Sequence, residues 1–402
     1  MHILLIHQAF VALDEPGGTR HHELARFLAQ RGHRVTIISS PVSYLTGLAR
    51  EAGAASASDR AEPNITILRT YTYSALHRSF VHRVLSFFSF MVSSFWAGLK
   101  VKQVDLVWGT SPPIFQGATA WALARLRRKP FLFEVRDLWP AFAIEVGVLR
   151  SPLLIRLSLW LERFLYRHAD QVIVNSPGFV EHVKGRGARD VRVVANGVDP
   201  LMFEPFATGF DFRQIYELQG RFIAMYAGAH GMSNDLEVLL GAARVLEDRP
   251  EIAIVLVGDG KEKPALRAHA EEIGLKNVFF LPPVPKLGMA QALAASDACI
   301  AILKPIPLYA TVYPNKVFDY MAAGRPVVLA IDGVIREVVE QAGCGVFAQP
   351  GDPVALAEAI RALADDREQA RAMGLRGREY VETNFEREEL AEELAVLMER
   401  MG

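Results

Sequence analysis

Short apolar runs that alternate with amphipathic helical stretches are the feature that most constrains the fold of this chain. Runs such as Val35–Ser39 and Ile252–Val257 are apolar almost throughout, as in strands that are buried on both faces of a parallel sheet. Helical stretches such as Thr19–Gln30 and Leu236–Glu247 separate successive runs. The alternation predicts an α/β fold in which helices cover both faces of doubly wound parallel sheets.

The alternation loosens after Asp199 and restarts at Phe222, which indicates a boundary between two domains. A chain of 402 residues also favours two domains over one. We expect an N-terminal Rossmann-like domain over 1–203 and a C-terminal Rossmann-like domain over 204–383. The final helix, about 384–402, is expected to pack back on the N-terminal domain.

The overall charge argues against a nucleic-acid partner. The formal net charge is −1 and the isoelectric point is near 6.9, so the basic excess expected of a nucleic-acid-binding protein is missing. The two cysteines, Cys299 and Cys344, lie far apart in apolar runs. A disulfide framework or a metal cluster is therefore not expected, and a cytoplasmic location is favoured. The apolar start, Ile3–Phe10, lacks a basic leader and is typical of a first strand rather than of a signal peptide.

Residues 310–330 carry the strongest functional pattern, ATVYPNKVFDYMAAGRPVVLA. Pro314 and Asn315 predict a helix start, because proline favours the first turn and an asparagine side chain can accept hydrogen bonds from free amides. The first turns also carry a cation, Lys316, and a carboxylate, Asp319. Free amides and a cation suit a phosphate group, and a carboxylate suits the hydroxyls of a ring. We therefore predict a site for a phosphorylated, hydroxylated ligand.

Five other positions are candidate site residues, and most have a plainer structural alternative. Gly18 follows a long loop and precedes a helix, so it either lets a ligand approach the backbone or belongs to a simple turn. Arg136 and Asp137 follow a predicted strand, where α/β proteins bind ligands, but they could pair only with each other. His230 is either a phosphate or sugar contact or a solvated loop histidine. Lys304 ends a predicted strand of the second domain, where its positive charge suits an anionic ligand.

One helical segment raises the question of a membrane. Residues 79–102 contain the apolar stretch VLSFFSFMVSSFWAGL with basic flanks, among them Arg83 and Lys100. The stretch is shorter than the roughly 20 residues of a spanning helix, and serines interrupt it. It is therefore either a buried core helix or an interfacial helix whose flanks meet anionic lipid. The amphipathic stretch Leu153–His168, by contrast, is expected to serve packing.

These patterns alone indicate a nucleotide-dependent enzyme or a two-lobed binding protein. Several motifs add a resemblance: VYPNKVFDYMAAGRPVV preceded by DACIAILKP, and also VRVVANGVD, VLVGDG and FFLPPV. They resemble the signatures of retaining glycosyltransferases of the GT-B fold, in glycosyltransferase family four (group 1). The resemblance spans essentially the whole chain and is densest from Gly258 to Val328. Within the family, the chain resembles bacterial O-antigen and capsule transferases, including N-acetylfucosamine transferases.

The resemblance implies two doubly wound domains that face a central cleft, with a nucleotide-sugar donor held mainly by the C-terminal domain. The donor would be UDP-linked and carry an N-acetylated hexose or deoxyhexose. The sugar would pass with retention of configuration to a lipid-linked or glycan acceptor in surface polysaccharide biosynthesis, lipopolysaccharide included. The resemblance implies neither a metal nor a cofactor. A lipid-linked acceptor would be found at the inner face of the plasma membrane, and the basic-flanked apolar segment suggests that the otherwise cytoplasmic protein attaches there peripherally.

The resemblance also assigns roles to single residues. Asp319 would bind the nucleotide ribose, Lys316 and the amides near Asn315 would meet the diphosphate, and the backbone of Pro282–Val284 would hold the base. The acceptor would dock near Gly18, Arg136 and Asp137. The residues expected to act in catalysis are Arg136, Asp137, Lys304 and Lys316. Those expected to bind the nucleotide sugar are Gly18, His230, Gly231, Val284, Thr311, Pro314, Asn315, Lys316 and Asp319.

Three features depart from the family pattern. Thr311 stands where the motif usually begins with Glu, and Arg136 stands where many relatives have His. The loop around His230 and Gly231 replaces one that carries an Arg and a Lys in many relatives. Because these departures affect sugar and phosphate recognition, a catalytically silent nucleotide-sugar-binding protein of the same fold stays open as an alternative. A sugar-nucleotide epimerase of this fold is the other alternative.

Overall fold

The computed structural model describes residues 1–402 apart from 13–17, 43–61 and 75–79. The chain divides into two compact units, Met1–Ala195 with Glu388–Gly402, and Asn196–Arg387. Part of the loop before Gly18 and the first residue of the apolar segment 79–102 lie outside the described residues. Each unit is an α/β structure around a parallel sheet, so the predicted fold class is confirmed.

The unit boundaries differ by a few residues from the expected ones. Residues 196–203 and 384–387 belong to the second unit. The Arg387 guanidinium donates to the carbonyl oxygens of the two residues that start this unit, Asn196 at 3.2 Å and Gly197 at 2.7 Å. The start and the end of the second unit are therefore joined to each other. The first boundary lies before the expected one and the second boundary lies after it.

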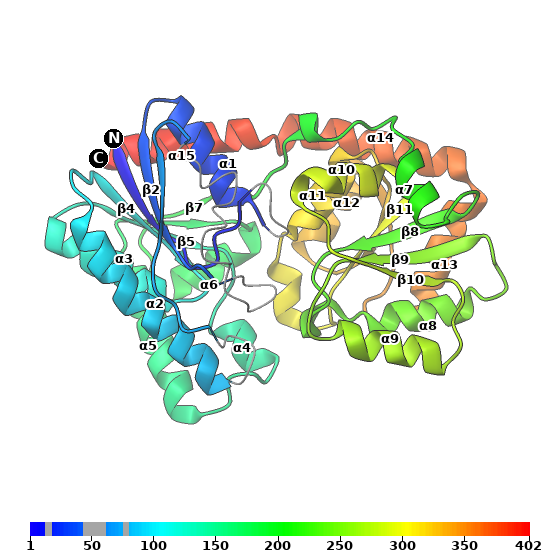
Figure 1. Ribbon diagram of the computed structural model, residues 1–402, viewed down its shortest axis with the longest axis horizontal. Coiled ribbons are helices and arrows are strands. Elements are labelled where there is room, and N and C mark those ends of the chain that lie inside the picture. Colours follow the sequence, from blue (N-terminus) through cyan, green and yellow to red (C-terminus); the bar gives the residue numbers. More distant parts are fainter. Residues whose placement is uncertain (13–17, 43–61, 75–79) are drawn as a thin grey trace. The chain divides into compact units, whose positions relative to one another are not determined.

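A parallel sheet forms the centre of the first unit (Figure 1), in the strand order β3-β2-β1-β4-β5-β6-β7. The inner strands are buried because helices cover both faces, as their apolar runs predicted. Strand β3, at one edge, is partly exposed along most of its length, and the sequence pattern did not reveal it. The strands are β1 (His2–Ile6), β2 (Arg34–Ser39), β3 (Ile65–Arg69), β4 (Leu106–Ser111), β5 (Phe131–Val135), β6 (Gln171–Val174) and β7 (Val191–Val193).

Two layers of helices cover this sheet. Helices α1 and α15 lie together on one face, where Leu24, Leu394 and Met398 share an apolar core with β1 and β2 (Figure 1). Helices α2, α3 and α5 lie on the other face, and α3 packs against both α2 and α5. The helices are α1 (Arg20–Gln30), α2 (Phe80–Lys100), α3 (Phe115–Arg127), α4 (Ala141–Glu145), α5 (Pro152–His168), α6 (Val180–Gly185) and α15 (Arg387–Met401).

The second unit repeats this architecture with the strand order β10-β9-β8-β11-β12-β13. Helices α7, α10, α11, α12 and α14 contribute to the core on one face, and α8, α9 and α13 to the core on the other. Cys299 and Cys344 are buried in the first of these cores as free thiols. The strands are β8 (Phe222–Ala227), β9 (Ile252–Val257), β10 (Val278–Leu281), β11 (Ala298–Ile302), β12 (Val327–Ala330) and β13 (Gly345–Phe347). The helices are α7 (Phe210–Ile215), α8 (Glu237–Val245), α9 (Lys263–Glu272), α10 (Lys286–Ala294), α11 (Asn315–Ala322), α12 (Val334–Ala342), α13 (Pro353–Asp365) and α14 (Arg367–Asn384).

Helix α2 is buried along one side only. Ser86, Phe90 and Ser94 face the protein and are fully buried. The opposite side exposes large apolar side chains at helical spacing: Val81, Leu85, Phe88, Val92, Trp96 and Leu99. One face of the helix therefore lies in the core, as the first alternative predicted, and the other face is exposed. Contact with lipid stays a prediction. No described helix is long and apolar enough to span a membrane.

Helix α5 also departs from expectation. Its second half packs as predicted, with Leu165 and Tyr166 buried. Its first half instead exposes Leu153, Leu157 and Trp160, which are spaced four and three residues apart on one side of the helix. The packing expectation for α5 is therefore correct only for its second half.

Helix α11 is held in place by an unusually close approach to α14. A Cβ atom built on Gly374 of α14 would lie 2.0 Å from the carbonyl oxygen of Gly324, just beyond the end of α11. No side chain fits at that distance, so the backbones touch only because residue 374 is glycine. This contact fixes the helix that carries Lys316 and Asp319.

We expect Gly374→Ala to lower the free energy of unfolding by roughly 1–3 kcal/mol, because the added methyl group must displace backbone. A urea titration followed by circular dichroism measures the loss. Gly185→Ala, where a Cβ atom meets nothing within 4 Å, is the control and should leave stability unchanged or slightly higher. Equal stability of the two variants would show that the α11–α14 contact can relax.

Candidate functional site

The start of α11 presents backbone amides without a side-chain cap. Pro314 occupies the N-cap position with φ −69° and ψ 123°, and the described part of the chain shows no side-chain cap for this helix. Asn315 is the first helical residue and is exposed. The predicted helix start is correct, but the expected capping by Asn315 is wrong, because a side chain that belongs to the first turn points outward from it. The Val317 amide donates to the Pro314 carbonyl oxygen at 3.1 Å, so the first two amides of the helix, those of Asn315 and Lys316, are the ones that suit a ligand.

Lys316 places a cation in a buried position beside these amides. Its Nζ atom lies 3.9 Å from the centre of the Tyr226 ring on β8 and has no hydrogen-bond partner among the described residues. Burial lowers the pKa of the ammonium to about 7. Gly228, with φ +153°, makes room for it, since a Cβ atom there would lie 2.9 Å from Nζ. The side chain is thus a buried donor that the described residues leave unsatisfied.

His230 lies in the loop after β8 and is completely buried, with 0% of its surface exposed. The alternative of a solvated loop histidine is therefore wrong. Its backbone amide donates to the Asp259 carbonyl oxygen at 2.8 Å, which ties the loop to the end of β9. Neither ring nitrogen has a partner among the described residues. Burial, with the nearby positive charges of Lys263 and Lys316, lowers the pKa of the ring to about 4, although Asp259 opposes the shift.

The loop after β8 also contacts the end of β11. The backbone amide of Lys304 donates to the Ser233 carbonyl oxygen at 3.0 Å, and the Tyr309 hydroxyl donates to Ser233 Oγ at 2.5 Å. Burial raises the pKa of Asp235, against the effect of the Lys304 charge. The structure therefore brings Lys304 to the same loop as His230, at the carboxyl ends of β8 and β11.

The remaining residues predicted in this unit have less distinctive surroundings. Gly231 precedes a short 3₁₀ turn, Met232–Asn234. The Thr311 hydroxyl donates to the Leu308 carbonyl oxygen at 2.6 Å. Val284 is half-buried against the core. Asp319 is half-buried in α11, one turn beyond Lys316.

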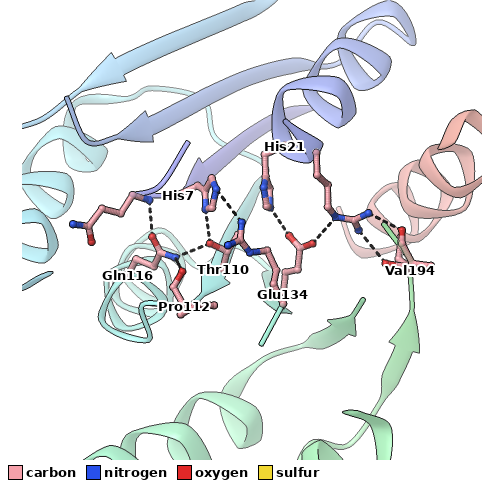
Figure 2. A network of polar contacts seen from close by, with 11 residues as sticks. His7, His21, Thr110, Pro112, Gln116, Glu134 and Val194 are labelled. Atoms are coloured by element: carbon pink, nitrogen blue, oxygen red, sulfur yellow. Dashed lines mark hydrogen bonds and ion pairs between the residues drawn. The ribbon is translucent and has the colours of Figure 1, made fainter. Parts of the chain in front are cut away.

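In the first unit, a buried network joins β1, β4, β5 and α3 (Figure 2). His7 Nδ1 lies 2.8 Å from Thr110 Oγ1, and Gln116 Nε2 donates to the same hydroxyl oxygen at 2.7 Å. Gln116 also accepts from the Gln8 backbone amide at 2.6 Å. Every residue of the network is buried. The network lies at the carboxyl end of the sheet, where open α/β proteins bind ligands.

A buried carboxylate forms the second part of this network (Figure 2). Glu134 on β5 accepts from Arg20 Nε at 3.0 Å and from His21 Nε2 at 2.8 Å, both on α1. Burial alone would raise the pKa of Glu134, but the His21 and Arg20 charges outweigh burial and lower it. The Arg20 guanidinium also donates to the Val194 and Ala195 carbonyl oxygens, at 3.0 and 2.6 Å. Glu134 therefore stays ionised and links β5 to α1. Arg20 in turn links α1 to the residues that follow β7.

Arg136 and Asp137 follow β5 directly and are both half-buried. Arg136 Nη1 lies 3.2 Å from His7 Nε2, so the guanidinium is joined to the network rather than only to its neighbour. Burial raises the pKa of Asp137 to about 7, against the effect of the Arg136 charge. Gly18, the third position expected near the acceptor, is exposed, and a Cβ atom there would meet nothing within 4 Å.

The site residues predicted from the sequence do not include His7, His21, Thr110, Gln116 or Glu134. The contacts that join β1 and α1 to the other elements link residues more than 100 positions apart, as with His7 and Thr110, so no local spacing reveals them. One local pattern could have indicated two of them: His7 and Thr110 are each a polar residue at the end of an apolar run, where a strand of a parallel sheet ends. Among the described residues, no group of three or more His, Cys, Asp or Glu side chains could hold a metal ion.

Two family models match the chain. The model described as "Glycosyl transferase 4-like domain" matches residues 17–197, and "Glycosyl transferases group 1" matches residues 221–366. Among curated proteins, the putative colanic acid biosynthesis glycosyl transferase WcaI of Escherichia coli is 25% identical over 352 residues, which cover 84% of this chain and 86% of that protein. The probable glycosyltransferase WbjE of Pseudomonas aeruginosa is 24% identical over 58% of this chain and 59% of its own length.

Solved structures show the same fold at low sequence identity. HepE of Anabaena, in complex with UDP and glucose, superposes with a TM-score of 0.76 and 18% identity over 100% of both chains. Sucrose-phosphate synthase of Thermosynechococcus elongatus has a TM-score of 0.77 at 20% identity, over 99% of this chain and 98% of that one. WaaG, a glycosyltransferase of lipopolysaccharide biosynthesis, has a TM-score of 0.70 at 14% identity, over 98% and 99%. The fold is thus GT-B, and with one family model on each unit, the chain belongs to the group 1 glycosyltransferases.

Proposed function

We propose that this glycosyltransferase moves a sugar from a UDP-linked donor to a lipid-linked or glycan acceptor, with retention of anomeric configuration and without a metal. The single observation that carries the donor part is the buried Lys316 ammonium, which has no hydrogen-bond partner among the described residues beside an uncapped helix start. A buried cation without a partner is costly, and an anion in contact with it removes that cost. A diphosphate supplies such an anion.

The second unit offers the other groups that a nucleotide sugar needs. The first-turn amides of α11 beside Asn315 suit phosphate oxygens, and Asp319 suits the ribose hydroxyls. His230 offers ring nitrogens to a sugar or phosphate oxygen, and Lys304 a charge for the leaving phosphate. The UDP complexes of HepE support a uridine donor. The likeness to retaining enzymes supports retention, and within that group we propose an N-acetylated hexose or deoxyhexose as the sugar.

In the first unit, Arg136 and Asp137 are the groups we propose for acceptor contact and catalysis. A pKa of about 7 lets the Asp137 carboxyl hold or release a proton at neutral pH. Arg136 supplies a fixed positive charge at the carboxyl end of β5. The colanic acid and lipopolysaccharide roles named for the relatives support an acceptor in surface polysaccharide synthesis, such as O-antigen or capsule. Thr311, where the motif Glu is missing, is the feature that favours a catalytically silent donor-binding protein instead.

Turnover separates these two functions. We expect transfer from a UDP-sugar in a panel of nucleotide sugars, and we expect Lys316→Ala and Asp319→Ala each to lower kcat/KM by roughly tenfold to hundredfold, the effect of one hydrogen bond to a charged group. Lys261→Ala and Asp332→Ala, at exposed positions of the same unit, are the matched controls. Binding of UDP-sugars without turnover on any acceptor would support the silent protein, and equal losses in the controls would refute the assignment of the site.

Binding of the donor should also take up a proton. The pKa of Lys316 is about 7 in the unliganded protein, so at pH 8 most of the ammonium is deprotonated. A bound diphosphate favours the charged form and raises this pKa, which draws a proton from solution. Calorimetry of UDP binding in buffers of different ionisation enthalpy measures the uptake. The uptake should approach one proton at pH 8 and disappear in Lys316→Met; equal uptake in that variant would exclude Lys316 as the phosphate contact.

We also propose a peripheral position on the inner face of the plasma membrane. The exposed apolar sides of α2 and α5 belong to helices that both pack on α3, on the same face of the sheet. Exposed arginines on α5 accompany this surface: Arg156, Arg163 and Arg167. Apolar side chains among basic ones are typical of a surface that binds anionic lipid.

We expect the wild-type protein to bind phosphatidylcholine vesicles that contain about one third phosphatidylglycerol, more weakly as salt rises. Trp96→Glu with Trp160→Glu, each 61% exposed, should reduce this binding at least tenfold because two aromatic side chains no longer leave water. Leu375→Glu, an exposed apolar position on α14, is the control and should bind as wild type does. Unchanged binding of the double variant, or self-association of the wild type through this face, would refute the membrane proposal.

A further inference from the structure

The hydrogen bonds of Gln116 in the buried network of the first unit each have a fixed direction. The Gln8 backbone amide can only donate, so the atom it meets at 2.6 Å is the amide oxygen of Gln116. The Pro112 carbonyl can only accept, so the atom 3.1 Å from it is the amide nitrogen. That nitrogen also donates to Thr110 Oγ1 at 2.7 Å. The hydroxyl oxygen of Thr110 is therefore an acceptor.

The donors and acceptors around His7 also determine which of its ring nitrogens carries the proton. A guanidinium has N–H donors and no acceptor, so His7 Nε2, 3.2 Å from Arg136 Nη1, must carry a lone pair. The single proton of the neutral ring is then on Nδ1, which donates to Thr110 Oγ1 at 2.8 Å. An imidazolium would instead direct an N–H group at the guanidinium. Burial and the charges of His21 and Arg136 lower the pKa of His7 well below its usual value, in agreement with a neutral ring.

We infer that His7 is a positioning residue for Arg136: the neutral Nδ1–H tautomer, hydrogen-bonded to Thr110, offers its Nε2 lone pair to the guanidinium. Figure 2 shows His7 between Thr110 and the adjoining His21 ring, whose centre lies 4.0 Å from that of His7. The ring is thus held by a hydrogen bond at Nδ1 and by packing. The inference rests on the proposed function only where it assigns Arg136 to acceptor contact.

Because His7 Nε2 is a fixed acceptor, the Arg136 guanidinium is held in one orientation at the carboxyl end of β5. Long arginine side chains lose much rotamer freedom when they are fixed, and the network supplies that order before any ligand binds. A purely structural network would stabilise the fold without depending on which ring nitrogen carries the proton. The tautomer of His7 and the kinetic link between His7 and Arg136 therefore distinguish positioning from simple packing.

A spectroscopic experiment tests the tautomer without any assay of activity. In protein labelled with ¹⁵N-histidine, the ring of His7, assigned by comparison with His7→Gln, should show a protonated Nδ1 and a bare Nε2 that stays bare from pH 6 to 8. In Arg136→Ala, the constraint is gone and the two tautomers should mix. A protonated Nε2 in the wild type, or a spectrum that Arg136→Ala leaves unchanged, would overturn the inference whether or not the protein transfers a sugar.

A kinetic experiment tests the link to Arg136. His7→Phe keeps a ring but removes the acceptor, and should lower kcat/KM for the acceptor by about tenfold to hundredfold with the donor KM unchanged. His7→Gln can place its side-chain oxygen near the position of Nε2 and should restore much of the loss. In the Arg136→Ala background, His7→Phe should cause no further loss. Thermal melting verifies that each variant is folded. Independent, multiplicative losses, or no rescue by glutamine in a folded variant, would overturn the inference.

Discussion

The burial of charged side chains at the carboxyl ends of both sheets is the constraint on which the rest of the structure depends. A buried charge must be paired, because its hydration is lost. In the first unit Glu134 meets this demand internally, since Arg20 and His21 bond to both of its oxygens. In the second unit, the Lys316 ammonium lies over the face of the Tyr226 ring and has no hydrogen-bond partner among the described residues. Glu134 is therefore paired within the protein, whereas the charge of Lys316 is left for a ligand to pair.

The sequence predicted the fold from features that are local. Apolar runs such as Ile252–Val257 and the helix start at Pro314 are set by neighbouring residues, and the structure reproduces them. The errors have local causes as well. Asn315 reads as a cap by residue type but lies one position inside the helix. The amphipathic pattern of Leu153–His168 led us to expect that its apolar face packs in the core, but the first half of that face is exposed. A sequence shows that a helix has an apolar face and does not show what covers that face.

The sequence could show which candidate site residues lie together only where one segment carries them. Lys316 and Asp319 lie on a single helix, so their spacing was visible in the sequence. His7 and Arg136 are brought together by the pairing of β1 with β4 and of β4 with β5. The residues that such pairing joins cannot be identified from spacing, because register over more than 100 positions depends on the packing of the whole sheet. The burial of His230 likewise depends on residues distant in the chain. The sequence suggested that its loop was polar and exposed, but the His230 amide donates to the Asp259 carbonyl oxygen after β9.

Desolvation shifts the pKa values of one basic and one acidic group to about the same value. It lowers the pKa of Lys316 to about 7 and raises that of Asp137 to about 7, so neither group has a settled proton at neutral pH in the unliganded protein. In the proposed reaction, the bond from sugar to diphosphate breaks and negative charge grows on the leaving phosphate. The bound donor would already have charged Lys316, and its attraction to the phosphate would be stronger in the transition state than in the bound donor. Interactions of this kind raise kcat rather than only lowering KM. The cost of keeping Lys316 buried without a partner is thus balanced by a stabilisation that appears during transfer.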